Sequence, residues 1–200
     1  SILDEQGVDR LCEAASKNKA KTHNFIYLGL GGVHKSISDD ELARILQAIL
    51  ERQDSIDIVI NILSMRFHDS DTTKSPSDKL ISLARQILLL SPFREHNKIG
   101  SDRNYQLVLL AQKCLVGEKG TEFATEFLQN FTKSIIEDRV SVFGYADLLC
   151  LIAREQPFVF LDIFLLNVES QIYFFKIIFN SELRGNPLDY ISDSILLAWS

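Results

Sequence analysis

The chain has 200 residues, of which 46% are hydrophobic and 24% charged, and this balance is typical of a globular domain or a short array of helical repeats. It excludes an intrinsically disordered chain. The formal net charge of −6 opposes binding to phosphate backbones and to anionic lipid, and the best basic cluster, Lys17, Lys19 and Lys21, is too small to reverse that field. We therefore expect no nucleic-acid partner and no membrane partner.

The cysteines and the most hydrophobic tract indicate a cellular compartment. Cys12, Cys114 and Cys150 are odd in number and widely separated, and we interpret them as reduced residues, as in a cytoplasmic protein. Residues 157–180 are the most apolar tract, but Asp162 and the polar residues 167–171 interrupt it. A membrane span needs about 20 apolar residues, so we predict a cytoplasmic protein without a membrane helix.

Residues 1–37 have the least regular pattern in the chain. A weak helical pattern is followed by a Lys/Asn-rich break and then by an apolar segment that ends in glycines, which suit a helix end or a loop. We predict that this N-terminal helical and loop segment packs on the remainder, residues 38–200, which form a helical domain.

From residue 38 onward the sequence predicts short amphipathic helices in series. Ser38 and Glu41 have the spacing of a capping box, and apolar residues then recur at every third or fourth position. A second cap is expected at Ser75. Further helices are predicted over residues 56–68, 76–88, 105–116, 121–135 and 145–155, in two Phe-rich segments within 157–180, and from Pro187 onward, with a turn at 117–121. The expected fold class is all-α.

The helix pairs recur with a regular period. They start near Ser38, Ser77, Thr121 and Pro157, at intervals of about 36 to 44 residues. In period and helix length, over about three quarters of the chain, this pattern resembles the HEAT and armadillo class of helical repeats, whose units have roughly 40 to 47 residues. The resemblance implies antiparallel helix pairs stacked as an α-solenoid that serves as a protein-interaction scaffold. An irregular helical domain is the alternative.

The adjacent His68 and Asp69, where an apolar helix runs into a polar loop, resemble the pair of the HD metal-dependent phosphohydrolases. In that all-α class a His, a His-Asp pair and a distant Asp hold a metal that activates water. The resemblance implies His34 as the first ligand and Asp102 or Asp147 as the last. However, Ser-Asp follows the pair where a small apolar residue and Gly are usual, and His34 lies in a glycine loop. The alternative is a histidine that interacts with the helix dipole.

Residues 29–36, GLGGVHKS, nearly match the phosphate-binding pattern GxxxxGK(S/T). His34 occupies the position of the glycine that lets the backbone amides face phosphate oxygens. No later strand ending in Asp follows to coordinate magnesium. The alternative is a helix that ends in glycines, followed by a turn with Lys35 in solvent.

Aromatic residues are concentrated after residue 157. We predict that some of them form a protein interface, namely Phe158, Phe164, Tyr173, Phe175 and Phe179. The alternative is that these Phe-rich helices are central and buried on several sides.

The functional prediction is a non-catalytic helical scaffold or protein-interaction domain. The sequence starts without Met and stops inside an apolar helical pattern, so we expect a fragment of a larger cytoplasmic protein. Its partner would be another protein or the flanking domains, with no cofactor, no metal and no small-molecule ligand. The alternative is the HD-like phosphohydrolase that uses His68 and Asp69.

Overall fold

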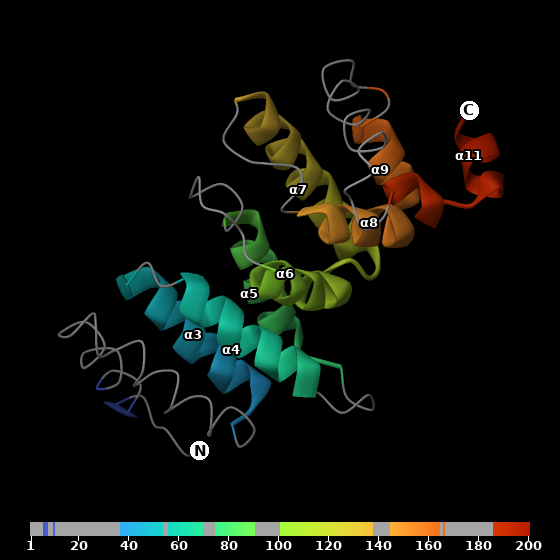
Figure 1. Ribbon diagram of the computed structural model, residues 1–200. Helices are drawn as coiled ribbons and strands as arrows, with labels where there is room; N and C mark the ends of the chain where they lie inside the picture. Colours follow the sequence, from blue (N-terminus) through green and yellow to red (C-terminus); the bar gives the residue numbers. More distant parts are fainter. Residues whose placement is uncertain are drawn as a thin grey trace. The chain divides into compact units, whose positions relative to one another are not determined.

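The computed structural model describes residues 6–7, 10, 37–53, 56–69, 75–90, 101–137, 145–164, 166 and 186–200 (Figure 1). Within these ranges eight α-helices and one 3₁₀ helix form the regular structure, and no strand is present. The predicted all-α class is confirmed. In the described ranges, no helix is both long and apolar enough to cross a bilayer. The predicted packing of residues 1–37 falls almost entirely outside the described residues and stays a prediction.

Contacts divide the chain into two compact units, residues 1–87 and 88–200. The first unit contains α3 (Asp39–Gln53), α4 (Ile56–Asp69) and most of α5 (Asp78–Leu90), and α3 packs against α4. One apolar stripe of α3 is fully buried, and α4 buries apolar residues on more than one face. The dense Ile and Val of α4 therefore support a buried helix, because a helix surrounded by protein needs no polar face.

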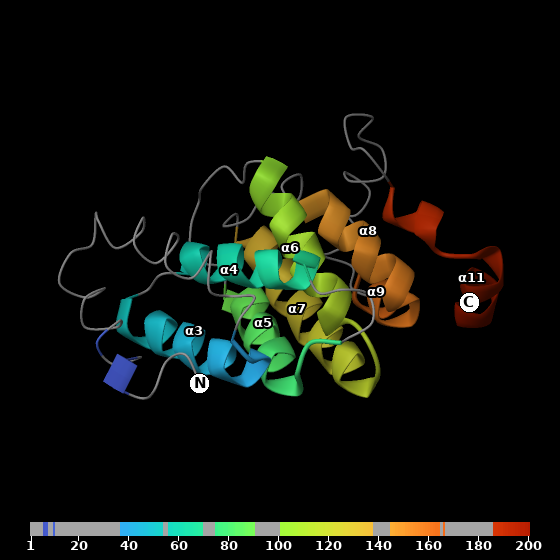
Figure 2. The ribbon, with the colours of Figure 1, turned by 90° about the horizontal axis from the view of Figure 1, so that it is seen from below.

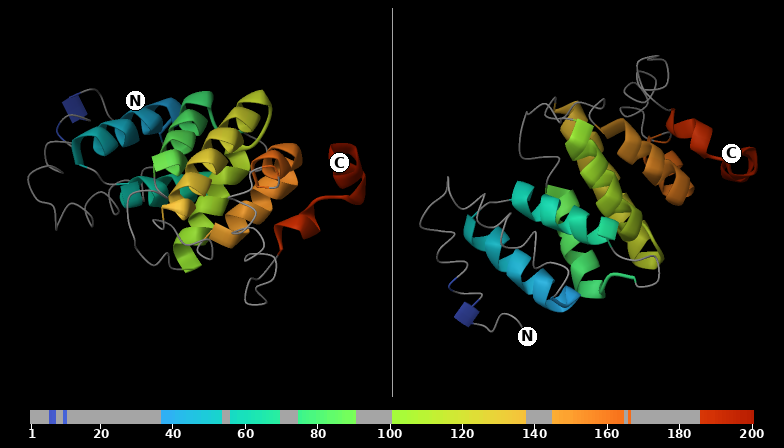
Figure 3. Two further views of the ribbon diagram at one scale, coloured as in Figure 1. Left: turned by 90° about the horizontal axis from the view of Figure 1, so that it is seen from above. Right: turned by 60° about the horizontal axis from the view of Figure 1, so that its bottom comes forward.

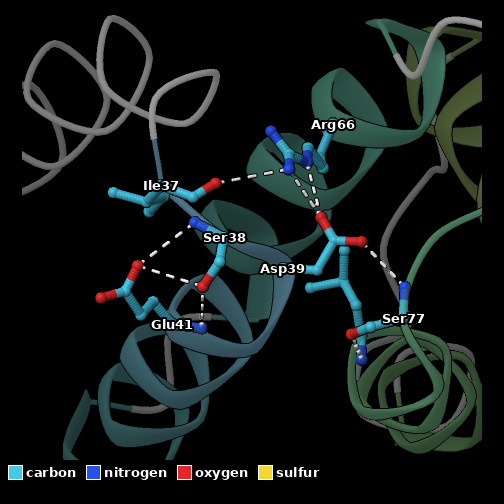
Figure 4. A network of polar contacts seen from close by, with 7 residues as sticks. Ile37, Ser38, Asp39, Glu41, Arg66 and Ser77 are labelled. Atoms are coloured by element: carbon cyan, nitrogen blue, oxygen red, sulfur yellow. Dashed lines mark hydrogen bonds and ion pairs between the residues drawn. The ribbon is translucent and has the colours of Figure 1, made fainter. Parts of the chain in front are cut away.

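The capping box predicted at the start of α3 is confirmed (Figure 4). The Glu41 amide donates to Ser38 Oγ at 3.3 Å, and the Ser38 amide donates to Glu41 Oε2 at 3.2 Å. Each side chain thus satisfies a backbone donor that has no partner in the first helical turn.

Asp39 joins three segments of the first unit (Figure 4). Its Oδ1 accepts from Arg66 Nε at 2.9 Å and from Nη2 at 2.7 Å, and its Oδ2 accepts from the Ser77 amide at 2.8 Å. Arg66 also donates to the Ile37 carbonyl at 3.4 Å. One carboxylate therefore connects the start of α3, the last turn of α4 and the start of α5.

The cap of α5 is Ser77, and the predicted cap Ser75 is wrong. Ser77 Oγ accepts from the Leu80 amide at 3.4 Å, and the Ser77 carbonyl accepts from the Ile81 amide at 3.0 Å. Asp39 Oδ2 accepts a hydrogen bond from the Ser77 amide, and this contact holds Ser77 at the N-cap position of α5. Pro76 consequently precedes the helix instead of lying in its first turn.

We expect Asp39→Ala to lower the free energy of unfolding by about 2–3 kcal/mol, because hydrogen bonds to a charged group contribute about 1.5–3 kcal/mol when they are partly buried. Urea denaturation measures this. The matched control is Asp40→Ala, which removes a carboxylate that contacts Lys79 at 2.8 Å with both side chains largely exposed. Equal unfolding midpoints for the two variants would contradict the role of Asp39.

The second unit contains the remaining helices. They are α6 (Ser101–Cys114), α7 (Glu118–Ile136), α8 (Ala146–Glu155), α9 (Pro157–Phe164), the 3₁₀ helix η3 (Pro187–Tyr190) and α11 (Asp193–Trp199). Helix α8 contacts α6, α9 and η3, and α7 lies beside α9 (Figures 1 and 3). The start of α9 at Pro157, directly after Gln156, is as predicted, since the residue before a proline disfavours helical geometry.

An aromatic ladder fixes the buried face of α7. Phe123, Phe127 and Phe131 are spaced four residues apart, with ring centroids 6.0 and 5.7 Å apart along the helix. Phe131 meets Tyr145 edge to face at 5.2 Å, just before α8 begins. All four rings are buried, so this stripe determines which side of α7 faces the core.

The turn between α6 and α7 lies at residues 115–117, so the predicted turn at 117–121 is correct only at Gly117, and its extension to residue 121 is wrong. Gly117 has φ +69°, and α7 begins at the next residue. A Cβ on Gly120 would lie 2.3 Å from the Leu115 carbonyl carbon, so glycine is needed there for close packing inside the helix. Gln156 Nε2 donates to the Leu115 carbonyl at 2.8 Å, which ties this turn to the α8–α9 corner.

The chain after Pro187 forms two short helices instead of the single one predicted. Asn186 Oδ1 accepts from the Leu188 amide at 3.0 Å and caps η3. Ile191 is then extended and 5% exposed, and Ser192 is also extended. Burial of the Ile191 side chain requires this break, and α11 starts anew at Asp193.

Helix α6 begins at Ser101, four residues before the prediction.

Candidate functional site

A groove between α7 and α9 is the candidate site in the second unit. Its volume is about 460 Å³. It is lined by Gln129, Thr132, Lys133, Ile136, Glu137, Asp162 and Ile163. We call it the α7–α9 groove.

The α7 wall of the groove is one face of that helix. Its four residues and the C-cap residue Glu137 have the spacing i, i+3, i+4, i+7 and i+8, which places them in a stripe. The aromatic ladder occupies the core side of α7. Because those rings are buried, the mixed polar stripe lies on another side of the helix and faces the groove beside α9. Ile136 is 40% exposed and adds apolar surface at the C-terminal end of the helix.

The α9 wall contains Asp162 and Ile163. Phe160 and Leu161 are fully buried and anchor this short helix, so the next two residues emerge at its outer side. Phe158 lies one helical turn before Asp162 and is 48% exposed. The exposed side of α9 therefore presents an aromatic ring next to a carboxylate.

The groove contains one cationic and two anionic side chains. Lys133, Glu137 and Asp162 are all exposed to solvent. Asp162 Oδ1 accepts a hydrogen bond from Trp199 Nε1 of α11 at 2.8 Å. With two carboxylates and one ammonium, the groove favours a ligand of positive charge.

Thr132 is the buried polar residue of the groove. It is 5% exposed, and within the described part of the chain its Oγ1 has no hydrogen-bond partner. A buried hydroxyl without a partner destabilises a fold by about 1–3 kcal/mol. The wild-type threonine thus weakens the fold at the same place where the groove lies.

We expect Thr132→Val to raise the free energy of unfolding by about 1 kcal/mol, because valine has nearly the same shape and no hydroxyl to desolvate. Thermal or urea unfolding measures the change. Thr125→Val is the control from the same helix, since Thr125 Oγ1 donates to the Thr121 carbonyl at 2.9 Å. Stabilisation by the control but not by Thr132→Val would contradict this interpretation.

The predicted interface residues fall partly within the described structure. Phe158 and Phe164 belong to α9, and Phe158 lies beside the groove. Tyr173, Phe175 and Phe179 lie outside the described residues. The interface assigned to these five residues stays a prediction.

The residues assigned to the metal alternative are distributed over the chain. His68 is exposed in the last turn of α4, where Asp69 is the final residue, and Asp102 is the second residue of α6. His34 lies outside the described residues, as does the glycine segment 29–36. Among the residues that the structure describes, no group of three or more His, Cys, Asp and Glu is arranged to hold a metal ion.

Cys150 is a buried thiol in α8. Desolvation by burial, followed by the negative charges of Asp147 and Asp189, raises its pKa from 9.0 to about 11. Thiolate is the nucleophilic form, so this environment makes Cys150 a poor nucleophile at neutral pH.

We expect Cys150 in the folded protein to react with iodoacetamide much more slowly than in the urea-unfolded protein at pH 8.5, because folding raises the pKa and buries the sulfur. Peptide mapping by mass spectrometry separates its labelling from that of the other cysteines. The pKa of Cys150 is higher in the folded than in the unfolded protein. The protonated thiol therefore adds to the free energy of unfolding below pH 9, and this contribution is lost as the pH rises toward 11. Fast native labelling would contradict the expectation.

Comparison with known proteins finds no match to a protein family, to a curated protein or to a solved structure. The α7–α9 groove is therefore interpreted from its own geometry. Sequence reasoning missed six of its seven residues and named Asp162 only as an interruption of an apolar tract. The available signal was the polar stripe that accompanies the Phe stripe of α7 at helical spacing.

Proposed function

We propose that this chain is a non-catalytic helical interaction domain that binds a segment of a partner protein in the α7–α9 groove. The observation that carries the proposal is the composition of this groove. It combines exposed apolar surface from Ile136 and from Phe158 nearby on α9 with the exposed carboxylates of Glu137 and Asp162. Exposed apolar surface beside charged groups suits a ligand with both apolar and polar groups.

The partner segment that fits is basic and carries an apolar anchor. Glu137 and Asp162 outnumber Lys133 in the groove, and the whole chain has a net charge of −6. An Arg or Lys of the partner would pair with these carboxylates, and a Leu-sized side chain would rest on Ile136 and Ile163. A volume of about 460 Å³ suits a few side chains of one segment.

We also propose that the helix pairs belong to the HEAT and armadillo class and that the protein acts as a cytoplasmic scaffold. The support is local. Helices α3 and α4 are neighbours in the first unit and are separated by two residues, and α8 and α9 are neighbours in the second and are separated by Gln156 alone. Short connections between neighbouring helices are typical of two-helix repeat units.

The experiment uses a fluorescein-labelled peptide of three Arg-Ala-Leu-Ala units, the Arg-Leu peptide, and a counterpart with Glu in place of Arg, the Glu-Leu peptide. We expect fluorescence anisotropy to detect binding of the Arg-Leu peptide and much weaker binding of the Glu-Leu peptide. Glu137→Gln should weaken the Arg-Leu complex about tenfold, because it removes a charge-assisted hydrogen bond.

Asp147→Asn is the matched control for the binding experiment. Asp147 is an exposed carboxylate on α8, outside the groove lining, so its loss changes the net charge equally. Equal weakening by Glu137→Gln and Asp147→Asn would indicate attraction to the overall charge and would contradict the groove. Equal affinity for the two peptides would contradict the proposed basic partner.

A further inference from the structure

We propose that Trp199 closes the α7–α9 groove from one side and that a basic partner residue must displace it. This inference rests on the proposed function, because it concerns how access to that same groove is controlled. Its physical basis is one carboxylate, Asp162, which belongs to two contacts.

Asp162 both lines the groove and holds α11. The Trp199 indole Nε1 donates to Asp162 Oδ1 at 2.8 Å. In the described structure, α9 is the helix that α11 contacts most. In Figure 2, α11 lies at the right edge of the second unit, beyond α9. A partner cation that binds Asp162 Oδ1 therefore competes with the indole N–H.

Helix α11 is held weakly in this position. None of its seven residues is buried, Leu197 is 77% exposed, and the Trp199–Asp162 hydrogen bond is itself exposed. Helices of fewer than about 12 residues are marginal in water unless packing stabilises them. Displacement of α11 thus removes little buried surface from the second unit.

The boundary between the fixed and the displaceable part lies at Ile191. Pro187 and Ile191 are buried, and η3 contacts α8. Ser192 is extended and exposed, and α11 follows it directly. Rotation about the Ser192 backbone would move α11 and leave η3 on the core.

A guanidinium group competes well against the indole for Asp162. The Trp199 N–H is a neutral donor with a single hydrogen, whereas an Arg side chain can donate two parallel charge-assisted bonds, which are roughly twice as strong. The apparent affinity of the groove equals its intrinsic affinity multiplied by the fraction of molecules in which α11 is open. Trp199 thereby selects for partners that bring a cation and excludes purely apolar ones.

The first experiment tests the contact in the isolated chain, without any peptide. Trp199 is the only tryptophan, so its fluorescence reports this site alone. We expect Asp162→Ala, which removes the acceptor, to red-shift the emission and to increase the acrylamide quenching constant, while the control Asp147→Ala leaves both unchanged. Identical quenching in wild type and Asp162→Ala would overturn the inference whatever the binding results are.

The second experiment measures affinity for the Arg-Leu peptide by anisotropy. Trp199→Phe keeps an aromatic ring and removes the N–H donor, so we expect binding about three- to tenfold tighter than in wild type. Leu197→Ala, on the same helix and largely exposed, should leave the affinity unchanged. Addition of unlabelled Arg-Leu peptide to the wild-type chain should increase Trp199 quenching.

The outcomes separate this inference from the proposed function. Equal affinity of wild type and Trp199→Phe would overturn the closing role of Trp199 and leave the groove as a binding site. No binding to either protein would overturn the proposed function and the inference together. Binding to Trp199→Phe alone would support both, with a groove that Trp199 closes more completely.

Discussion

Burial of the aromatic face of α7 is the constraint on which the candidate site depends. Phe123, Phe127 and Phe131 place one side of the helix against the core, and the edge-to-face contact with Tyr145 extends that packing to the start of α8. A helix with a fixed apolar side also has its remaining sides fixed, because residues are placed about 100° apart around its axis. The groove wall that begins at Gln129 is therefore a geometric consequence of core packing.

Two aspartates illustrate opposite uses of a carboxylate in this protein. Asp39 is about one-fifth exposed and has donors on both oxygens, so it holds the helix ends of the first unit together. Asp162 is exposed and has the Trp199 indole as its donor at 2.8 Å. Exchange of one donor for another at such an exposed carboxylate costs little free energy. The first arrangement suits a structural role and the second suits a binding role.

Features set by neighbours in sequence were predictable, and features set by distant residues were not. The Ser38–Glu41 capping box and the break at Gln156–Pro157 are local and were found from spacing alone. The Ser77 cap depends on Asp39, 38 residues earlier, and the start of α7 depends on close packing of Gly120 against Leu115. The groove required knowledge that α9 lies beside α7, which no single-helix pattern supplies. Burial of Ile191, which ends η3, is likewise a tertiary effect.

The groove and α11 share a physical property, namely that the fold is not locally optimal there. Thr132 places a hydroxyl in apolar surroundings without a partner, and α11 presents an apolar sequence with no residue buried. Each of these features lowers stability, whereas α3 and α5 bury their apolar faces and have side-chain caps. Departures from local consistency are expected at functional sites, where function takes precedence over stability. Thr132 lines the same groove as Asp162, and Trp199 of α11 donates to Asp162. Both features that lower stability are therefore close to the carboxylate that we propose binds the partner.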